Sequence, residues 1–235
     1  MKAYKRVLIK LSGEALAGEK KTGLDFAVIT CVCQAIKRCV DSGVQVSLVI
    51  GGGNFWRGVK DGAGKVERVS ADRMGMLATA MNCLAVADVL RTLGVDAAVQ
   101  TAVEIGGVGE HYDTAAAVRY LEAGKVVLFA CGTGCPFFST DTAAALRAAE
   151  TGAEVILLAK NIDGVYSADP KSDPSAVKYN TITYAEVLAK RLAVMDSTAT
   201  SLAMDNDIPV LVFALAEPEN LVHAVMGEQV GTLVH

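Results

Sequence analysis

The chain has 235 residues, of which 52% are hydrophobic and 20% charged, and its formal net charge is -4. A chain of this length forms one large domain or two small ones, and its composition excludes intrinsic disorder, which requires low hydrophobicity and high net charge. The acidic surplus also argues against nucleic acid as an obligate partner, because proteins that bind it usually carry a surplus of Lys and Arg that neutralises phosphates.

The apolar segments and the cysteines indicate the compartment in which the protein acts. Lys10 interrupts the first apolar run, Val7–Ile9, and no apolar stretch reaches the length of about 18 residues that a membrane-spanning helix needs. The six cysteines have neither paired CxxC spacing nor a His at zinc-ligand distance, a pattern typical of reduced thiols. We therefore expect a cytoplasmic protein with no membrane partner and no requirement for nucleic acid.

Short β-branched apolar runs alternate along the chain with Ala-rich and Leu-rich stretches of helical character. Asp25 is suited to begin a helix as its N-cap, and Thr183 with Glu186 predicts a capping box at the start of another. In chain order, the expected elements are strand Arg6–Leu11, helix Asp25–Val40, strand Val44–Ile50, a helix from Ser70 or Asp72 to Leu93, strand Ala97–Gln100, helix Asp113–Glu122, strand Val126–Ala130, helix Ser139–Thr151, strand Val155–Ala159, helix Tyr184–Lys190, helix Asp196–Asn206, strand Val210–Phe213, helix Glu219–Met226 and strand Gly231–Val234.

The predicted strands are continuous apolar runs separated by helices, which is typical of a mostly parallel sheet covered by helices on both faces. No linker rich in Ser, Pro or Gly divides the chain, and no internal repeat is found. The sequence therefore predicts a single α/β domain over residues 1–235. Within it we expect an acceptor lobe over residues 1–150 and a donor lobe over residues 151–235.

Four polar segments that contain glycine or small residues follow predicted strands, where open parallel sheets bind their ligands. In the first, Lys10–Gly13, the ammonium group suits a phosphate, and Ser12 and the glycine allow the backbone to approach it. The second is Gly51–Asn54, in which three glycines free backbone N–H groups to surround an oxygen, and Arg57 behind it adds a charged donor.

The other two segments lie further along the chain. The third, Gly132–Asp141, passes from glycines to hydroxyl side chains and a carboxylate at a predicted helix start, a position that favours anions through free N–H groups and the helix dipole. The fourth, Asn161–Pro170, contains Tyr166 and Asp169, which suit a nucleotide base and ribose.

Each segment taken alone also has a structural reading. Lys10 suits a solvated strand end, Gly51–Gly53 a tight turn, and Asp141 a helix cap. Together the segments supply cations, free N–H groups and a few carboxylates, which is what phosphoryl transfer needs. The chain has no GxxxxGK[ST] loop, and it lacks the G-x-G-x-x-G spacing after its first strand that a nicotinamide oxidoreductase would carry.

Five motifs occur in a characteristic order: YKRVLIKLSGEAL, VIGGGNFWRG, ADRMGMLATAMN, GTGCPFFSTD and DGVYSADP. In this order they resemble the bacterial-type UMP kinases of the amino acid kinase family, and the similarity extends from about residue 4 to the terminal MGEQVGTLV. The resemblance implies a three-layer αβα sandwich around a mostly parallel sheet of about eight strands. It implies transfer of the γ-phosphoryl group of ATP to UMP, giving UDP and ADP in pyrimidine nucleotide biosynthesis.

The resemblance has further implications for ligands and partners. Mg²⁺ is expected to accompany ATP and to be held mainly by the nucleotide phosphates rather than by side chains alone. A homo-oligomer, in the form of a hexamer, is expected. UTP is expected as a feedback inhibitor and GTP as an activator, since many family members respond to both.

The resemblance also assigns site residues by motif. Lys10, Asp141 and Arg57 are expected to be catalytic, with Lys10 stabilising charge on the transferring phosphoryl group and Asp141 orienting Lys10 or the metal–phosphate group. The expected ATP site consists of Lys10, Leu11, Ser12, Gly13, Gly53, Arg57, Lys160, Asn161, Tyr166 and Asp169, and the sequence leaves open which of Lys160 and Asn161 faces ATP. The expected UMP site consists of Gly52, Asp72, Thr133, Gly134, Cys135, Pro136, Phe137, Phe138, Ser139 and Thr140.

One departure and three rival functions complete the sequence interpretation. Cys135 stands where family members commonly have Asn, which affects base recognition and places a reactive thiol in the expected acceptor loop. The first rival is a kinase of the same superfamily that acts on carbamate, an acidic amino acid or an isoprenoid phosphate; the acceptor loop with Asp72 favours a nucleoside monophosphate instead. The second is a non-catalytic nucleotide-binding protein, which the presence of Lys10 and Asp141 disfavours. The third is the nicotinamide oxidoreductase that the glycine spacing disfavours.

Overall fold

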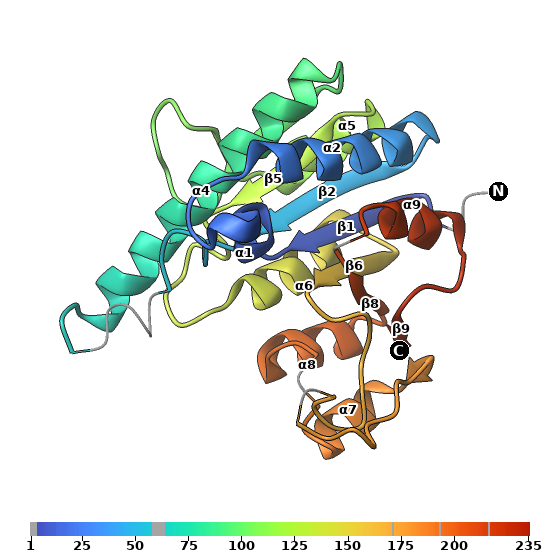
Figure 1. The fold of residues 1–235 in the computed structure, drawn as a ribbon. Coiled ribbons are helices and arrows are strands. Elements are labelled where there is room, and N and C mark those ends of the chain that lie inside the picture. The colour runs from blue at the N-terminus through green and yellow to red at the C-terminus, as the bar shows by residue number, and fades with distance from the viewer. Residues whose placement is uncertain (1–3, 58–63, 171, 193, 216) are drawn as a thin grey trace.

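The computed structural model describes the whole chain except residues 1–3, 58–63, 171, 193 and 216 (Figure 1). Gly58, which closes the second glycine-rich motif, therefore lies outside the described residues. The described strands form one nine-stranded sheet in the order β4-β3-β5-β2-β1-β6-β8-β9-β7. These strands are β1 (Arg6–Leu11), β2 (Gln45–Ile50), β3 (Ala97–Thr101), β4 (Glu110–His111), β5 (Val126–Ala130), β6 (Val155–Lys160), β7 (Thr181–Ile182), β8 (Val210–Ala214) and β9 (Thr232–Val234).

The sheet is almost entirely parallel. β1 occupies its middle, between β2 on one side and β6 on the other, and pairs with both in parallel. The antiparallel pair β8–β9 is the exception, and β7 then pairs in parallel with β9. Parallel strands buried on both faces need apolar residues at every position, which explains why β5 and β6 appeared in the sequence as continuous apolar runs.

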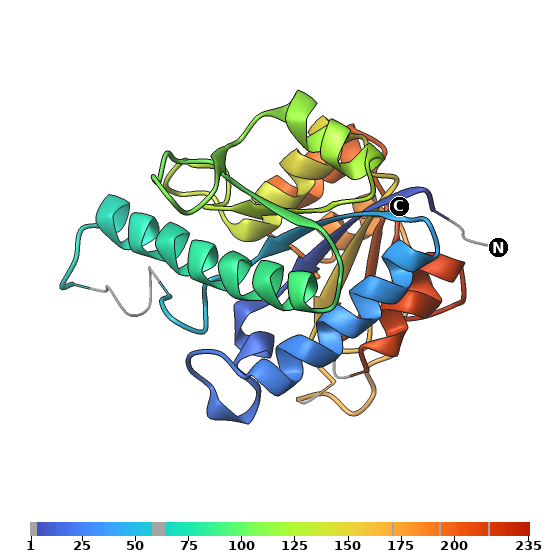
Figure 2. The same cartoon turned by 90° about the horizontal axis from the view of Figure 1, so that it is seen from above.

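Helices cover both faces of the sheet, as seen from above in Figure 2. Val7 and Ile9 of β1 pack into one core with α2, α4 and α9, whereas Leu8 packs into the other core with α5, α6 and α8. The predicted three-layer αβα sandwich is thus confirmed. The described helices are α1 (Gly13–Leu16), the 3-10 turn η1 (Gly18–Lys20), α2 (Phe26–Asp41), α4 (Arg68–Thr92), α5 (Thr114–Glu122), α6 (Thr140–Thr151), α7 (Tyr184–Ala189), α8 (Ser197–Asp205) and α9 (Glu219–Met226).

The long elements lie where the sequence predicts them, and the differences have local causes. α4 begins at Arg68, before the predicted Ser70 or Asp72, because the Arg68 Nε donates to the Asp72 carboxylate at 2.8 Å and supports an earlier first turn. β4 and β7 are two-residue strands, too short to show a hydrophobic period, and they raise the sheet from the expected eight strands or so to nine.

α4 is also long and apolar enough to cross a membrane by length and composition alone. It has 25 residues, and its most apolar window has a mean hydropathy of 1.3. Half of that window is buried inside the molecule, where the helix packs on β3, β5 and α2. This is the behaviour of the core helix of a globular domain, so α4 gives little support to a membrane-spanning role.

Candidate active site

The first two glycine-containing segments touch each other beyond the carboxyl ends of β1 and β2. The Gly51 N–H donates to the carbonyl of Leu11 at 2.9 Å. Gly13 lies so close to the second segment that a Cβ on it would stand 2.2 Å from the Gly51 carbonyl oxygen. Only glycine allows this approach, so Gly13 is needed for the two loops to meet.

An ion pair joins the first segment to the third. Lys10 Nζ lies 2.5 Å from Asp141 Oδ1, and the two side chains are only 13% and 18% exposed. Asp141 does not cap α6, because the Ser139 hydroxyl accepts the N–H groups of Asp141 and Thr142 and is itself the cap. The Asp141 carboxylate is therefore left to hold the ammonium group of Lys10 at the end of β1.

A second lysine enters the same electrostatic environment from the end of β6. Burial lowers the pKa of Lys160, with the Asp141 charge opposing this shift and the Lys10 charge adding to it. The Lys160 ammonium group donates to the carbonyl of Val194. Two cations and one carboxylate thus act on one another where β1, β6 and α6 meet.

Arg57 lies on the outer side of this region. Its guanidinium group forms an ion pair with Glu14 of α1 at 2.6 Å, and both side chains are 42% exposed. Glu14 also lies near Gly53, since a Cβ on that glycine would stand 3.2 Å from Glu14 Oε1. The carboxylate of Glu14 therefore links the catalytic candidate Arg57 to the glycine segment.

A cavity of about 440 Å³ opens beside Lys160. Tyr166 and Asp169 line it, as the sequence predicts for a donor site, together with Lys190 and Arg191 from the end of α7. Asn161 instead lines a separate cavity of about 520 Å³ together with Glu14 and Cys31. The sequence leaves open whether Lys160 or Asn161 faces ATP, and in the structure it is Lys160 that shares a cavity with Tyr166 and Asp169.

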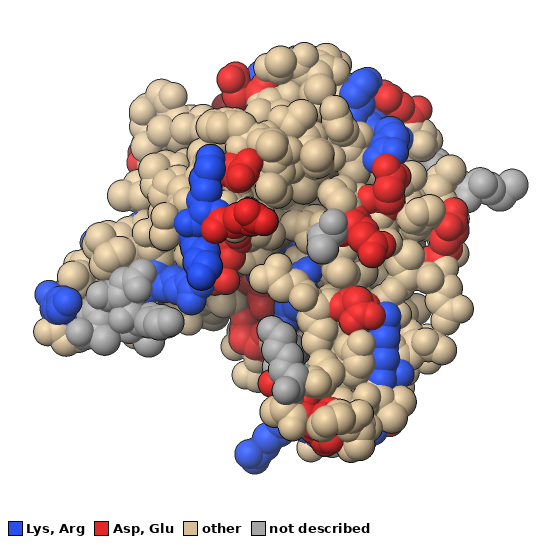
Figure 3. Space-filling model, in the orientation of Figure 1, with Lys and Arg blue, Asp and Glu red and all other residues tan. Residues whose placement is uncertain are grey.

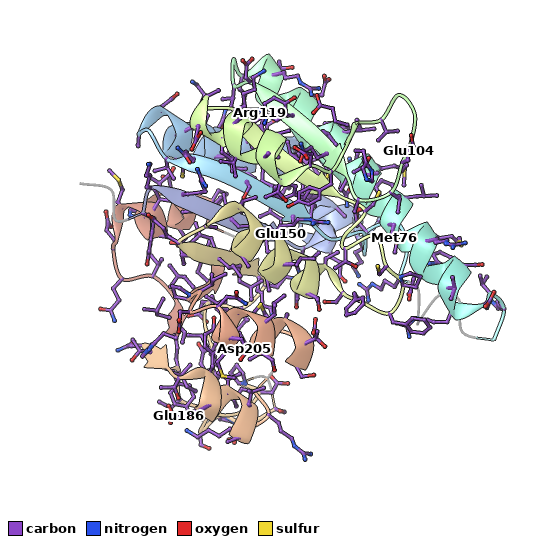
Figure 4. All side chains as sticks on the ribbon, turned by 180° about the vertical axis from the view of Figure 1, so that it is seen from behind. Met76, Glu104, Arg119, Glu150, Glu186 and Asp205 are labelled. Carbon is purple, nitrogen blue, oxygen red and sulfur yellow. The ribbon has the colours of Figure 1, made fainter. Side chains whose placement is uncertain are left out.

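A smaller cavity of about 170 Å³ lies beside the start of α6, where Ser139 and Thr140 line it. The predicted residues in its lining are Gly52, Asp72, Thr133, Cys135, Phe138, Ser139 and Thr140. Trp56 also lines it, as do Thr79 and Met76 of α4, and Met76 is labelled in Figure 4. Gly134, Pro136 and Phe137 are absent from the described lining. Thr140 lines this cavity and directly precedes Asp141, while Lys160, which interacts with the Asp141 charge, lines the cavity of 440 Å³. The ion pair is therefore close to residues of both cavities.

Phe137 is held at the rim instead. Its backbone N–H donates to Asp72 Oδ2 at 2.8 Å, the same oxygen that accepts from Arg68. The Arg68 guanidinium lies 5.1 Å from the centre of the Phe137 ring, and Phe137 adopts a left-handed φ of 72°. Asp72 therefore anchors the acceptor loop to α4.

Charged groups are otherwise dispersed. The face in Figure 3 carries Lys and Arg side chains interspersed with Asp and Glu, and not a continuous basic surface. Within the described part of the chain, no three His, Cys, Asp or Glu side chains gather closely enough to hold a metal ion. A cation at this site would therefore depend on ligands that a bound nucleotide supplies.

Several residues in this region were not among the sequence candidates. Glu14 belongs to the YKRVLIKLSGEAL motif, but only the structure shows that it forms an ion pair with Arg57. Asp196 was predicted only as a helix start; it caps α8 and also accepts the hydroxyl groups of Ser139 and Thr142. These partners are distant in sequence, so no local pattern could have revealed them.

Known proteins share both the family pattern and this architecture. The model of the amino acid kinase family matches residues 5–214. The structure of UMP kinase from Bacillus anthracis is similar at 39% identity and a TM-score of 0.95, covering 99% of this chain and 96% of that one. UMP kinase from Ureaplasma parvum follows at 37% identity and a TM-score of 0.92, with 98% of each chain covered. Uridylate kinase from Archaeoglobus fulgidus matches at 30% identity and a TM-score of 0.76 over 100% of both chains. The site therefore stands in a chain that belongs to the amino acid kinase family.

Proposed function

We propose that this protein is a UMP kinase, which transfers the γ-phosphoryl group of ATP to UMP and releases UDP and ADP in pyrimidine nucleotide biosynthesis. The observation that carries the proposal is the Lys10–Asp141 ion pair, which lies close to Lys160 of one cavity and to Thr140 of the other. The similarity to three UMP or uridylate kinases over nearly the whole chain supports the choice of reaction.

The donor nucleotide occupies the cavity beside Lys160 in this proposal. Tyr166 and Asp169 face the base and ribose, while the segment from Leu11 through Gly13, together with Gly53, receives the phosphates through backbone N–H groups. Lys10 meets the negative charge that develops on the transferring phosphoryl group. Asp141 holds Lys10 in place, so that no reorganisation is needed at the moment of transfer.

The acceptor nucleotide occupies the smaller cavity. Gly52, Asp72 and the cavity-lining residues of the loop Thr133–Thr140 contact UMP. Arg57 lies where the two nucleotides meet, and on binding its guanidinium group exchanges the ion pair with Glu14 for one with a nucleotide phosphate. Gly134, Pro136 and Phe137 support this loop from outside the cavity. The phosphate oxygen of UMP is already nucleophilic near neutral pH, so the mechanism needs no strong general base.

Mg²⁺ belongs to this proposal as a companion of ATP. A site with isolated carboxylates suits Mg²⁺, which keeps several waters and binds through phosphates and one or two carboxylates, and Asp141 is the nearest such group. When bound, the ion neutralises charge on the phosphates.

The decisive experiment is an assay of ADP release from MgATP with UMP, CMP, dUMP, carbamate or aspartate as acceptor. We expect rapid turnover with UMP alone. Turnover with carbamate or aspartate would make this chain another kinase of the family. Tight ATP binding without turnover on any acceptor would support the non-catalytic alternative.

We also propose the remaining properties that the resemblance implies. The protein acts in the cytoplasm, consistent with six unpaired cysteines that suit a reducing compartment. UTP acts as inhibitor and GTP as activator. Residues 1–150 form the acceptor lobe and residues 151–235 the donor lobe of a single domain.

Assembly into a homohexamer is part of the same proposal. α4 carries four exposed apolar side chains along one stripe, Met74, Leu77, Met81 and Leu84, which are 40%, 52%, 45% and 38% exposed. Their alternating spacing of three and four residues is that of a seam between packed helices. Such a stripe is unfavourable in water and supports contact between copies of the chain.

A further inference from the structure

Two buried asparagines connect the second glycine segment to α4. Asn54 follows the three glycines and is 2% exposed, and Asn82 lies on α4 and is fully buried. A buried amide is unfavourable unless its donors and acceptor are paired. Their retention inside an otherwise apolar core therefore requires an explanation.

The two side chains pair with each other and with the backbone. Asn82 Nδ2 donates to the Gly51 carbonyl at 2.6 Å and to Asn54 Oδ1 at 2.8 Å. Asn54 Nδ2 donates to Asn82 Oδ1 at 2.9 Å and to the Gly23 carbonyl at 2.7 Å. Each amide has two hydrogens, so every side-chain donor of the pair is used. This closed pattern permits one orientation of each amide.

The pair lies beneath the contact between the first and second glycine-containing segments. A Cβ on Gly13 would stand 2.5 Å from Asn54 Oδ1, in addition to its close approach to the Gly51 carbonyl. Three successive glycines have the most freely moving backbone a chain can contain. The carbonyl held by Asn82 belongs to the first of them, so Asn82 restrains the flexible segment where it leaves β2.

We propose that Asn82 is a positioning residue for phosphoryl transfer. Through Gly51 and Asn54 it fixes the backbone of Gly51–Gly53 in the orientation that presents the N–H groups of Gly52 and Gly53 to the nucleotide phosphates, while the Gly51 N–H stays bonded to Leu11. Asn82 is fully buried and acts only through these neighbours. This inference rests on the proposed kinase function and adds to it a residue outside the binding surfaces.

The test compares Asn82→Ala with Cys83→Ala. Both residues are fully buried neighbours on α4, but the Cys83 side chain packs in the apolar core. At saturating ATP and UMP, we expect Asn82→Ala to lower kcat by about tenfold or more, because catalysis by orientation is sensitive to small displacements. We expect Cys83→Ala to leave kcat within about twofold of the parent, although its melting temperature falls. Amide hydrogen exchange of Gly51–Asn54 should be faster in Asn82→Ala alone.

Two outcomes would overturn the inference: a kcat of Asn82→Ala within about twofold of the parent at a temperature where both are folded, or an equal loss of kcat in Cys83→Ala. If Asn82→Ala does not fold, Asn82→Leu retains side-chain volume without hydrogen bonds and takes its place in the same comparison. A parent without turnover on UMP would refute the proposed function instead. The exchange comparison would still decide whether Asn82 orders the glycine segment.

Discussion

At the scale of single residues, the site is organised around Lys10, whose position at a central strand end and whose pairing with Asp141 leave little freedom to the ammonium group. Such pre-organisation is most useful for charge that exists only in the transition state. A group of this kind should contribute to turnover far more than to substrate affinity.

Lys10→Ala is therefore expected to lower kcat by about a hundredfold or more while changing the Kd for UMP by less than about threefold. Steady-state assays together with calorimetric UMP titration would measure the two effects separately. An unchanged kcat would remove Lys10 from the mechanism.

The six cysteines differ sharply in accessibility. Burial raises the pKa of the Cys33 and Cys39 thiols to about 12 and also raises the pKa of Cys83 and Cys131, so all four stay protonated near neutral pH. Cys31 and Cys135 are exposed. Native protein should therefore react with maleimide at two positions.

UMP should protect only one of them. Cys135 lines the smaller cavity, whereas Cys31 lines a different one and serves as the internal control. Mass spectrometry of labelled peptides with and without UMP would follow both rates. Equal rates at Cys135 in the presence and absence of saturating UMP would place the nucleotide elsewhere.

At the scale of elements, the start of α6 carries one side chain that caps the helix, Ser139, and one that holds Lys10, Asp141. Ser139 caps the helix and also donates to Asp196, the cap of α8, so one hydroxyl joins two helix starts. Asp141, two residues later, turns its carboxylate to Lys10 instead. Replacing Ser139 should therefore act on the helix caps, whereas replacing Asp141 should act on the ion pair with Lys10.

Ser139→Ala should lower the free energy of unfolding by about 1 kcal/mol, the usual cost of losing a helix cap. Asp141→Asn should remove most of the activity at a temperature where the variant is folded, and it should also lower the free energy of unfolding, because Lys10 loses the charge that is paired with it. Urea unfolding and the ADP-release assay on both variants would test this contrast. Retained activity in folded Asp141→Asn would remove this carboxylate from the mechanism.

The sequence predicted elements well where a local pattern exists. β5 and residues Val155–Ala159 of β6 are continuous apolar runs, and Asp25 is the N-cap of α2 as predicted, so local pattern was enough to locate these elements. The pairing of Asn54 with Asn82 could not be predicted, because the two residues are 28 positions apart and neither carries a motif for the other. Which loop residues face a cavity was equally inaccessible, since Phe137 and Phe138 are adjacent and only Phe138 lines it.

At the scale of the whole molecule, the apolar stripe of α4 is the feature least expected of a monomer, because its four large side chains are exposed to water. These residues are absent from both cores, whereas Met76, Ala80, Cys83, Val86, Ala87 and Leu90 of the same helix pack into one core, so assembly can cover the stripe without disturbing the fold.

Leu77→Glu should consequently shift the assembly toward smaller species, because a charge in a helix seam is poorly solvated. Val177→Glu, at an apolar side chain that is 66% exposed outside α4, provides the matched control and should keep the parent's mass. Sedimentation velocity would measure both. An unchanged sedimentation coefficient for Leu77→Glu would exclude the stripe from the interface.

The central place of β1 also has a consequence for biosynthesis. β1 is synthesised before both of its neighbours: β2 follows it closely in the chain, but the partner of its other edge, β6, begins only at Val155. Until then the nascent chain presents an unpaired strand edge that contains the apolar run Val7–Ile9 and that other chains could join. Co-translational chaperones are thus expected to engage this protein until about residue 160, and a fragment that ends near residue 150 should aggregate rather than fold.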